Sequence, residues 1–84
     1  MKMYVKTVLS VEGTTATHIA ELKEIDSTSC AMLRILEVEG GVLSRIPKPT
    51  EVVPHPDTFD KYEDITATHL SAEEFEQMWQ QAAS

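Results

Sequence analysis

One stretch near the C-terminal end decides the fold class, LSAEEFEQMWQQAA (Leu70–Ala83). Ser71 and Glu74 have the spacing of a capping box, in which each side chain accepts a hydrogen bond from the other residue's backbone N–H. The acidic residues that follow the cap interact favourably with the helix dipole. This stretch predicts a helix from Ser71 to Ala83.

The same helix is predicted to be amphipathic. Phe75, Met78, Trp79 and Ala82 follow the spacing i, i+3, i+4 and i+7, which places them on one apolar stripe. Leu70 precedes the cap at the position that packs against the helix in a hydrophobic staple. A stripe of this kind needs an apolar surface to cover, so we expect a sheet beneath it.

Residues before the helix supply that sheet. Apolar and polar residues alternate from Met3 to Val11, which predicts a strand, and Gly13 favours a turn after it. The segment Thr15–Ile25 fits both a helix and a strand, because its apolar residues step partly by three and partly by two. Clustered threonines and the lack of a capping box favour a strand. A bulge in that strand would explain why its apolar residues do not alternate regularly.

Two further strands are predicted before residue 47. A turn over Asp26–Ser29 precedes Met32–Glu39, whose two faces both carry apolar residues, as in a central strand. Gly40-Gly41 suits a two-residue hairpin, and Val42–Ile46 returns as an edge strand. Residues 1–46 therefore predict a four-stranded antiparallel β-meander.

A proline-rich connection is predicted over residues 47–69, where all four prolines fall. Proline lacks a backbone N–H and restricts the residue before it, so regular structure is expected to pause there. We expect one helical turn over Glu51–Val53 and another capped by Asp57 or Thr58. The whole chain is predicted to be one α+β domain, with residues 70–84 as its helical end.

The predicted strand alternation also selects a sheet face for the helix. We expect its apolar stripe to pack on the face that carries Met3, Val5, Leu9, Leu33 and Ile35.

Size and composition limit the classes of function. On folding, a chain of 84 residues buries only about 60–65% of the surface that its unfolded form exposes. The resulting core is thin, which disfavours a deep active site that excludes water. No apolar stretch approaches the roughly 20 residues of a membrane span, and no signal peptide is recognisable. The single cysteine, Cys30, is predicted to be a buried structural thiol, and we expect a cytoplasmic location.

Charge is distributed unevenly along the chain. Up to Arg45 there are five basic and six acidic residues, whereas residues 46–84 hold two basic and eight acidic ones. An acidic field of this kind repels phosphate backbones and anionic lipids and attracts basic surfaces. We expect no direct binding of nucleic acid or membrane.

No pattern for catalysis or for a cofactor is recognisable. The separations of His18, His55 and His69 match no zinc site, and Cys30 has no second thiol beside it. The acidic cluster that begins at Asp57 lacks the ligand spacing of a calcium loop. We therefore predict neither a metal, nor a cofactor, nor an enzyme.

Three stretches together carry a family resemblance. Glu24-Ile25-Asp26, Arg34–Val38 with Gly40-Gly41, and LSAEEFEQMW (Leu70–Trp79), with Ile46-Pro47 and Phe59 before it, occur in order. This arrangement resembles a bacterial family known as domain of unknown function 6881. Because that family has no established activity, the resemblance implies a compact α+β fold and nothing about chemistry.

The first functional hypothesis is a small acidic protein-binding module of a bacterium or phage. It would act as an inhibitor, antidote or immunity protein on a basic partner, for example a protein that handles nucleic acid. Its predicted contact residues are Asp57, Asp60, Glu63, Asp64, Glu73, Glu76 and Tyr4.

The second hypothesis is a subunit that binds a small anionic ligand, or an enzyme subunit, with its site completed across a homodimer. Arg34 and Arg45 could grip an anion in bidentate fashion, with His18 beside them. A plain structural role also remains open at this point.

Overall fold

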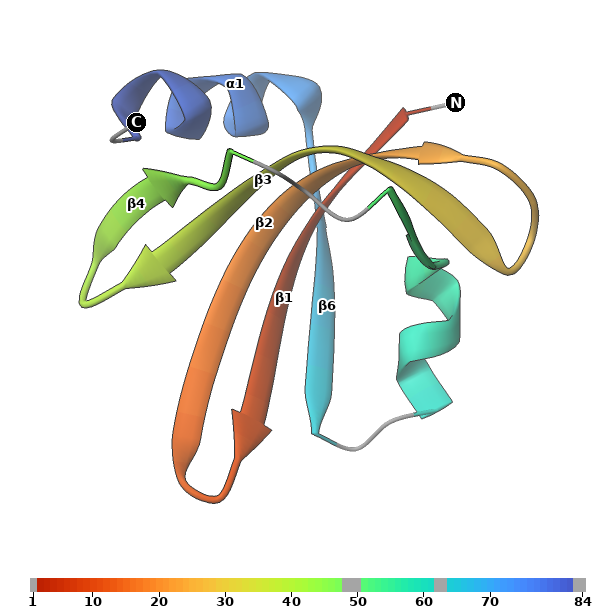
Figure 1. The fold of residues 1–84 in the computed structure, drawn as a ribbon, viewed down its shortest axis with the longest axis horizontal. Helices are drawn as coiled ribbons and strands as arrows, with labels where there is room; N and C mark the ends of the chain where they lie inside the picture. The colour runs from red at the N-terminus through yellow and green to blue at the C-terminus, as the bar shows by residue number, and fades with distance from the viewer. Residues whose placement is uncertain (1, 48–50, 62–63, 83–84) are drawn as a thin grey trace.

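The computed structural model describes residues 2–47, 51–61 and 64–82 and has an α+β fold with one antiparallel sheet (Figure 1). The sheet has six strands, so the prediction of four was wrong in number although the fold class is confirmed. In chain order the elements are β1 Lys2–Val11, β2 Thr14–Glu24, β3 Ser29–Glu39, β4 Val42–Arg45, β5 Val52–Pro54, the 3-10 helix η1 Pro56–Lys61, β6 Ile65–Leu70 and α1 Ala72–Gln81.

The strands follow the order β4-β3-β2-β1-β6, and β5 pairs with the first part of β3. Every pairing is antiparallel, so the predicted meander β1 to β4 is present. β6 then returns beside β1, with Tyr4 opposite Leu70 and Leu9 opposite Ile65. In Figure 1, α1 (blue) lies at the upper left and η1 (turquoise) at the lower right, beside β6.

Two tight hairpins join the first and last strand pairs of the meander. Gly40 and Gly41 have φ of 57° and 81°, which is the geometry of the turn that suits twisted antiparallel strands. Glu12 and Gly13 connect β1 to β2 in the same way, and Glu12 adopts a positive φ of 50° despite its side chain. Both predicted turns are confirmed.

The proline-rich connection holds two strands that the sequence did not predict. Val52–Pro54 forms β5, so the helical turn expected over Glu51–Val53 is wrong. The second expected turn is present as η1, but it begins at Pro56, before the predicted caps Asp57 and Thr58. Cys30 lies opposite Val53 in the ladder between β3 and β5. The short β5 gains its pairing from β3, which lies more than 20 residues earlier, and local sequence does not reveal such a partner.

A bulge lies between β2 and β3, but its extra residue is in β3 and not in Thr15–Ile25, where the mixed phase predicted one. Glu21 lies opposite Arg34, and Leu22 lies opposite Met32, so Leu33 is the extra residue. Without this insertion, either Met32 or Arg34 would point to the other face of the sheet. The bulge thus keeps apolar pairs on one face and the Glu21–Arg34 pair on the other.

α1 begins as predicted. The Ser71 hydroxyl accepts a hydrogen bond from Glu74 N–H at 3.0 Å, and the Glu74 carboxylate accepts one from Ser71 N–H at 3.0 Å. The helix ends at Gln81 with Ala82 as its C-cap, slightly before the predicted end. Leu70 packs with the cluster that contains Phe75, in agreement with the expected staple.

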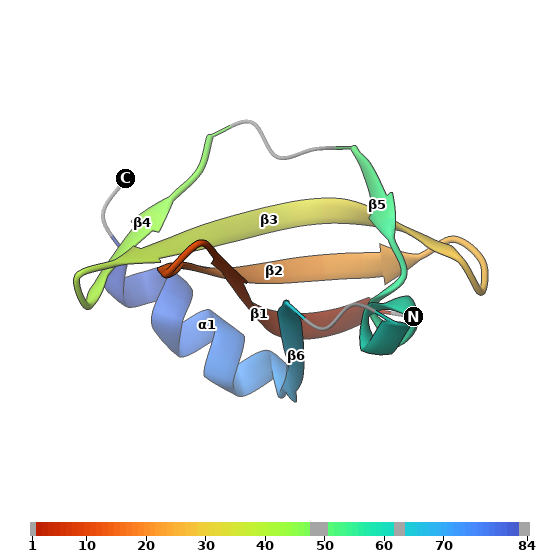
Figure 2. The ribbon, with the colours of Figure 1, turned by 90° about the horizontal axis from the view of Figure 1, so that it is seen from below.

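Two separate cores lie on the two sides of the sheet. The helix face is the side that α1 covers, where Ile19, Leu36 and Phe75 are buried with Met78 and Trp79 around them. The open face is the opposite side, which has its own buried cluster of Val5, Ala20, Leu22 and Cys30. α1 and β5 lie on opposite sides of β2 and β3 in Figure 2.

The predicted surface for the helix was therefore wrong. Met3, Val5 and Ile35 belong to the open-face cluster, and Leu9 and Leu33 are each 38% exposed. The apolar stripe of α1 does pack on the sheet, but on the side of Tyr4 and Leu36. Both faces of β2 and β3 are apolar, so alternation alone could not decide between them.

Candidate binding surface

The open face contains a groove of about 200 Å³, which we call the open-face groove. Cross-strand pairs build its floor, with Val5 opposite Ala20 and Ala20 opposite Ile35. Thr7 and His18, which also lie opposite each other, form a more polar part of the lining. The lining residues are Val5, Thr7, His18, Ala20, Leu22, Met32, Ile35, Val53 and Pro54.

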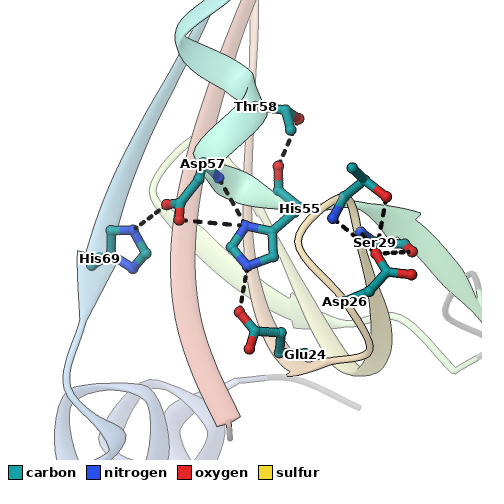
Figure 3. A network of polar contacts seen from close by, with 8 residues as sticks. Glu24, Asp26, Ser29, His55, Asp57, Thr58 and His69 are labelled. Atoms are coloured by element: carbon teal, nitrogen blue, oxygen red, sulfur yellow. Dashed lines mark hydrogen bonds and ion pairs between the residues drawn. The ribbon is translucent and has the colours of Figure 1, made fainter.

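One wall of the groove comes from β5 and is held in place by His55 (Figure 3). The His55 ring is only 3% exposed, and its Nε2 lies 2.8 Å from a carboxylate oxygen of Glu24. Its Nδ1 accepts a hydrogen bond from Asp57 N–H at 3.1 Å, so Nε2 carries the proton and donates to Glu24. The backbone N–H of His55 donates to the Thr28 carbonyl at 3.0 Å.

Asp57 extends this network toward β6. Its carboxylate lies 3.7 Å from His55 Nδ1 and 3.9 Å from Nε2 of His69, while 74% of its side chain is exposed. His69 lies opposite Val5 and therefore on the open face. The Asp57 carboxylate therefore lies at the border of the open face, between the two histidines.

The cations of the first four strands all lie on one face of the sheet, whereas carboxylates lie on both. Alternation along the strands puts Glu24, Glu37 and Glu39 on the open face, because Glu24 reaches His55 and Glu37 lies opposite His18. Together with Asp57 these residues make four carboxylates. The cations of β1 to β4 all fall on the helix face: Lys2, Lys6, Lys23, Arg34 and Arg45. Within the side chains that the structure describes, the open face carries no lysine or arginine.

The arginines of the helix face are engaged within the protein. Arg34 Nε and Nη2 donate to the two oxygens of Glu21 at 2.8 and 2.9 Å, and Nη2 also pairs with Glu76. Its guanidinium carbon lies 4.8 Å from the centre of the Phe75 ring and 4.9 Å from that of Trp79. The hydrogen bonds to these carboxylates raise the pKa of Arg34, and the bond from Arg34 lowers the pKa of Glu21 despite its burial.

Arg45 is held in a similar way. Its Nε and Nη2 donate to the Trp79 carbonyl at 3.1 and 2.7 Å, and its guanidinium carbon lies 4.6 Å from the centre of the Trp79 ring. Trp79 lies near the end of α1, where carbonyl groups lack helical partners. Arg45 therefore caps the helix from the neighbouring edge strand.

The residues predicted for an anionic ligand are not brought together. Arg34 and Arg45 lie on the helix face, whereas His18 lines the groove on the open face. Both guanidinium groups already have partners within the chain.

The residues predicted to contact a protein partner are spread over several elements. Asp57, Asp64 and Glu73 are exposed, while Glu76 is bound to Arg34. The side chain of Asp60 and the whole of Glu63 lie outside the described residues.

Tyr4 was expected to be an exposed contact, and its position differs. Its ring packs against Phe75 with 5.2 Å between ring centres. Burial, together with the nearby Glu21 carboxylate, raises the pKa of the Tyr4 hydroxyl. Tyr4 thus belongs to the core beneath α1.

Cys30 is fully buried, as predicted, and its burial raises the pKa of the thiol. A raised pKa disfavours the thiolate that a nucleophile needs. Among residues 2–47, 51–61 and 64–82, no group of three or more histidine, cysteine or acidic side chains has the arrangement of a metal site. In the same part of the chain, no helix has the length and apolar character that a membrane crossing requires.

No family model, curated protein or solved structure matches this chain. The resemblance to domain of unknown function 6881 therefore stays a prediction. The open-face groove and the role of His55 were both missed from the sequence. Alternation in β1 hinted at an apolar face, but a groove depends on which strands become neighbours.

Proposed function

We propose that this protein is a small acidic binding module whose open face docks onto a basic segment of a partner protein. The observation that carries the proposal is the uneven distribution of charge across the sheet. Four carboxylates border the open face, and the described lysines and arginines of the sheet lie on the other side.

Among the described side chains, this arrangement leaves the open face with carboxylates and without lysine or arginine, which favours a negative electrostatic potential there. Arg34 and Arg45 cannot neutralise it, because their guanidinium groups are bound to Glu21, Glu76 and the Trp79 carbonyl. Charges of one sign on a surface steer an oppositely charged partner and reject like-charged ones. The partner class is thus a basic protein surface.

The proposed activity is occlusion of that surface, as in an inhibitor, antidote or immunity protein. Surfaces that bind nucleic acid are rich in lysine and arginine, so a nucleic-acid-handling protein is the class of partner that the charge fits best. The proposal includes no catalytic step, and the carboxylates disfavour direct contact with phosphate.

Selection from a random twelve-residue peptide library displayed on phage tests the proposal. The bait is the full chain in about 50 mM salt, where charge interactions are screened less than at physiological ionic strength. We expect the selected peptides to be enriched in lysine and arginine relative to the starting library. Selected sequences that are neutral or acidic would contradict the proposal.

A matched pair of variants then locates the contact. Glu37→Gln and Glu73→Gln remove the same charge, but Glu37 lies on the open face and Glu73 lies in the first turn of α1. We expect Glu37→Gln to weaken binding of a selected peptide several-fold and Glu73→Gln to change it far less. Equal losses would mean that net charge, rather than the open face, attracts the peptide.

A further inference from the structure

We infer that the open-face groove takes one bulky apolar side chain of the basic segment and so anchors it. This inference rests on the proposed function and adds the chemistry of the partner: a cationic segment with an aromatic or branched aliphatic residue at its centre. Three features of the groove carry it, namely its size, its preformed walls and the charges at its border.

The size of the groove suits a single side chain. Its volume of about 200 Å³ is below the roughly 300–1,000 Å³ of pockets for drug-sized ligands. An apolar cavity of about 150 Å³ is known to hold benzene. One phenyl ring or one leucine side chain therefore fits, whereas a large cofactor does not.

The groove exists because a small residue stands among larger ones. Ala20 lies between Val5 and Ile35 in neighbouring strands, so the floor dips at its methyl group. Leu22 and Met32 close one end, and the bulge at Leu33 is what turns Met32 toward this face. A side chain that enters would contact apolar atoms on several sides.

The wall from β5 is preformed. Val53 pairs with Cys30, and the next residues are held by the bonds of His55 to Thr28 and Glu24. A pocket with fixed walls costs little ordering on binding, which raises the affinity for a matching side chain.

The carboxylates at the border of the groove favour basic residues on either side of the bound apolar side chain. Glu37 lies opposite His18, which lines the groove, and Asp57 follows Pro54 by three residues on the other side. Cross-strand neighbours are about 5 Å apart, and an extended chain advances about 3.3 Å per residue. Lysine or arginine within one or two residues of the anchor can therefore reach these carboxylates.

The same charges argue against other occupants. A second copy of this chain would bring its own acidic open face, and the net charge of each copy is −7. A fatty acid would bring a carboxylate beside Glu37 and Asp57. Like charges placed together at an interface are unfavourable, so neither occupant matches as well as a cationic segment.

Two synthetic peptides test the inference. Both have two lysines on each side of a central residue, which is phenylalanine in one and glycine in the other, and both have blocked ends. Titration into the ¹⁵N-labelled chain in about 50 mM salt, followed by amide NMR, reports affinity and contact residues together. We expect the phenylalanine peptide to bind about tenfold or more tightly, the gain typical of burying that side chain. Its shifts should centre on Ala20, Ile35 and Val53.

Filling the groove provides the decisive variant. Ala20→Leu projects added methyl groups into the groove, so we expect it to abolish the advantage of the phenylalanine peptide and to leave the glycine peptide unchanged. Thr7→Leu, at the rim, is a second variant for the case in which Ala20→Leu does not fold. The amide spectrum of each variant alone shows whether the fold is kept.

The outcomes separate the two proposals. If both peptides bind equally at the open face and neither filled variant matters, the inference fails and the proposed function stands. If neither peptide contacts the open face, both fail. Saturable binding of decanoate in the groove, or dimerisation through the open face in sedimentation, would replace the cationic segment by another occupant and overturn the inference.

Discussion

At the scale of single residues, the ionised carboxylate of Asp26 stabilises the turn between β2 and β3. Its Oδ1 accepts hydrogen bonds from the backbone N–H groups of Thr28 and Ser29 at 2.8 and 2.9 Å, and from both hydroxyls. These bonds favour the carboxylate and lower the pKa of Asp26 from 3.8 to about 2. A lowered pKa in the folded state means that the ionised group stabilises the fold.

The pH dependence of stability follows from this sign. The contribution of Asp26 is complete above pH 3.8, its ordinary pKa, and is lost as the pH falls toward 2. Urea unfolding between pH 2 and 5 should show this loss, and Asp26→Asn, which keeps an acceptor oxygen without the charge, should lack it. A carboxyl-carbon NMR titration that gave Asp26 an ordinary pKa would contradict the prediction.

The Glu21–Arg34 pair is a second feature at the level of single residues. Glu21 is buried, and Arg34 supplies its bidentate partner. Arg34→Met would leave the carboxylate without that partner. We expect a loss of about 2–3 kcal/mol, below the roughly 3–5 kcal/mol of a fully buried pair, because 25% of the Arg34 side chain is exposed.

Urea denaturation measures this loss, and the double variant is its control. Glu21→Met with Arg34→Met removes both charges and should recover much of the stability, since an apolar pair can replace a buried ion pair. No recovery in the double variant would mean that Arg34 acts mainly through its packing on Phe75 and Trp79.

Among the elements, α1 depends most clearly on a short sequence signal. Ser71→Ala removes the side-chain acceptor for Glu74 N–H, and the helix should lose about 1 kcal/mol. Ser71→Asp keeps an acceptor at the cap and adds a charge that suits the helix dipole, so it should lose much less. Thermal unfolding followed by circular dichroism compares the two variants. Equal losses would argue against the capping role.

β6 shows how an element can depend on its neighbours. Ile65, Ala67 and His69 point to the open face, and Leu70 packs with the core beneath α1. The strand lies at the edge of the sheet, where β1 provides its backbone partners. It also brings α1 to the correct place, because Ser71 follows it directly. The position of the helix is thus decided by a strand that the sequence pattern did not reveal.

At the scale of the whole molecule, the core is thin, so the free energy of unfolding depends strongly on a few buried side chains. Phe75 is fully buried beneath α1, and its ring packs against those of Tyr4 in β1 and Trp79 in α1. Phe75→Ala should cost about 3–5 kcal/mol, a large part of the roughly 4–13 kcal/mol that 84 residues provide at typical stability per residue. We expect this variant to be largely unfolded at 37 °C.

Chemical denaturation and near-ultraviolet circular dichroism check this expectation. Val42→Ala is the matched control, because Val42 is 59% exposed on the edge strand and should change stability by less than about 0.5 kcal/mol. A Phe75→Ala variant that unfolds at the same urea concentration as the parent would show that α1 does not support the sheet.

Local sequence patterns were sufficient to predict a structural feature wherever the interactions that form it join residues close together in the chain. The capping box of Ser71 and Glu74, the Gly40-Gly41 hairpin and the turn at Asp26 each depend on atoms within a few residues, so the sequence predicted all three correctly. The strand in Thr15–Ile25 was also predicted correctly, although the bulge beside it lies in β3, at Leu33.

Of the candidate site, Asp57 and His18 were predicted from the sequence as candidate contacts. The sequence patterns missed Glu24, Glu37 and Glu39, which lie in the part of the chain whose charges nearly cancel.

Tertiary structure decided what depends on pairing between distant residues. Both faces of β2 and β3 are apolar, so only the register with β1 and the bulge at Leu33 determine which face receives α1. The same register gathers the groove residues and places all the cations of β1 to β4 on the helix face, opposite Glu24, Glu37 and Glu39. Shifting one strand by a single residue would reverse the side chains, and a linear sequence does not state which residues will lie opposite each other.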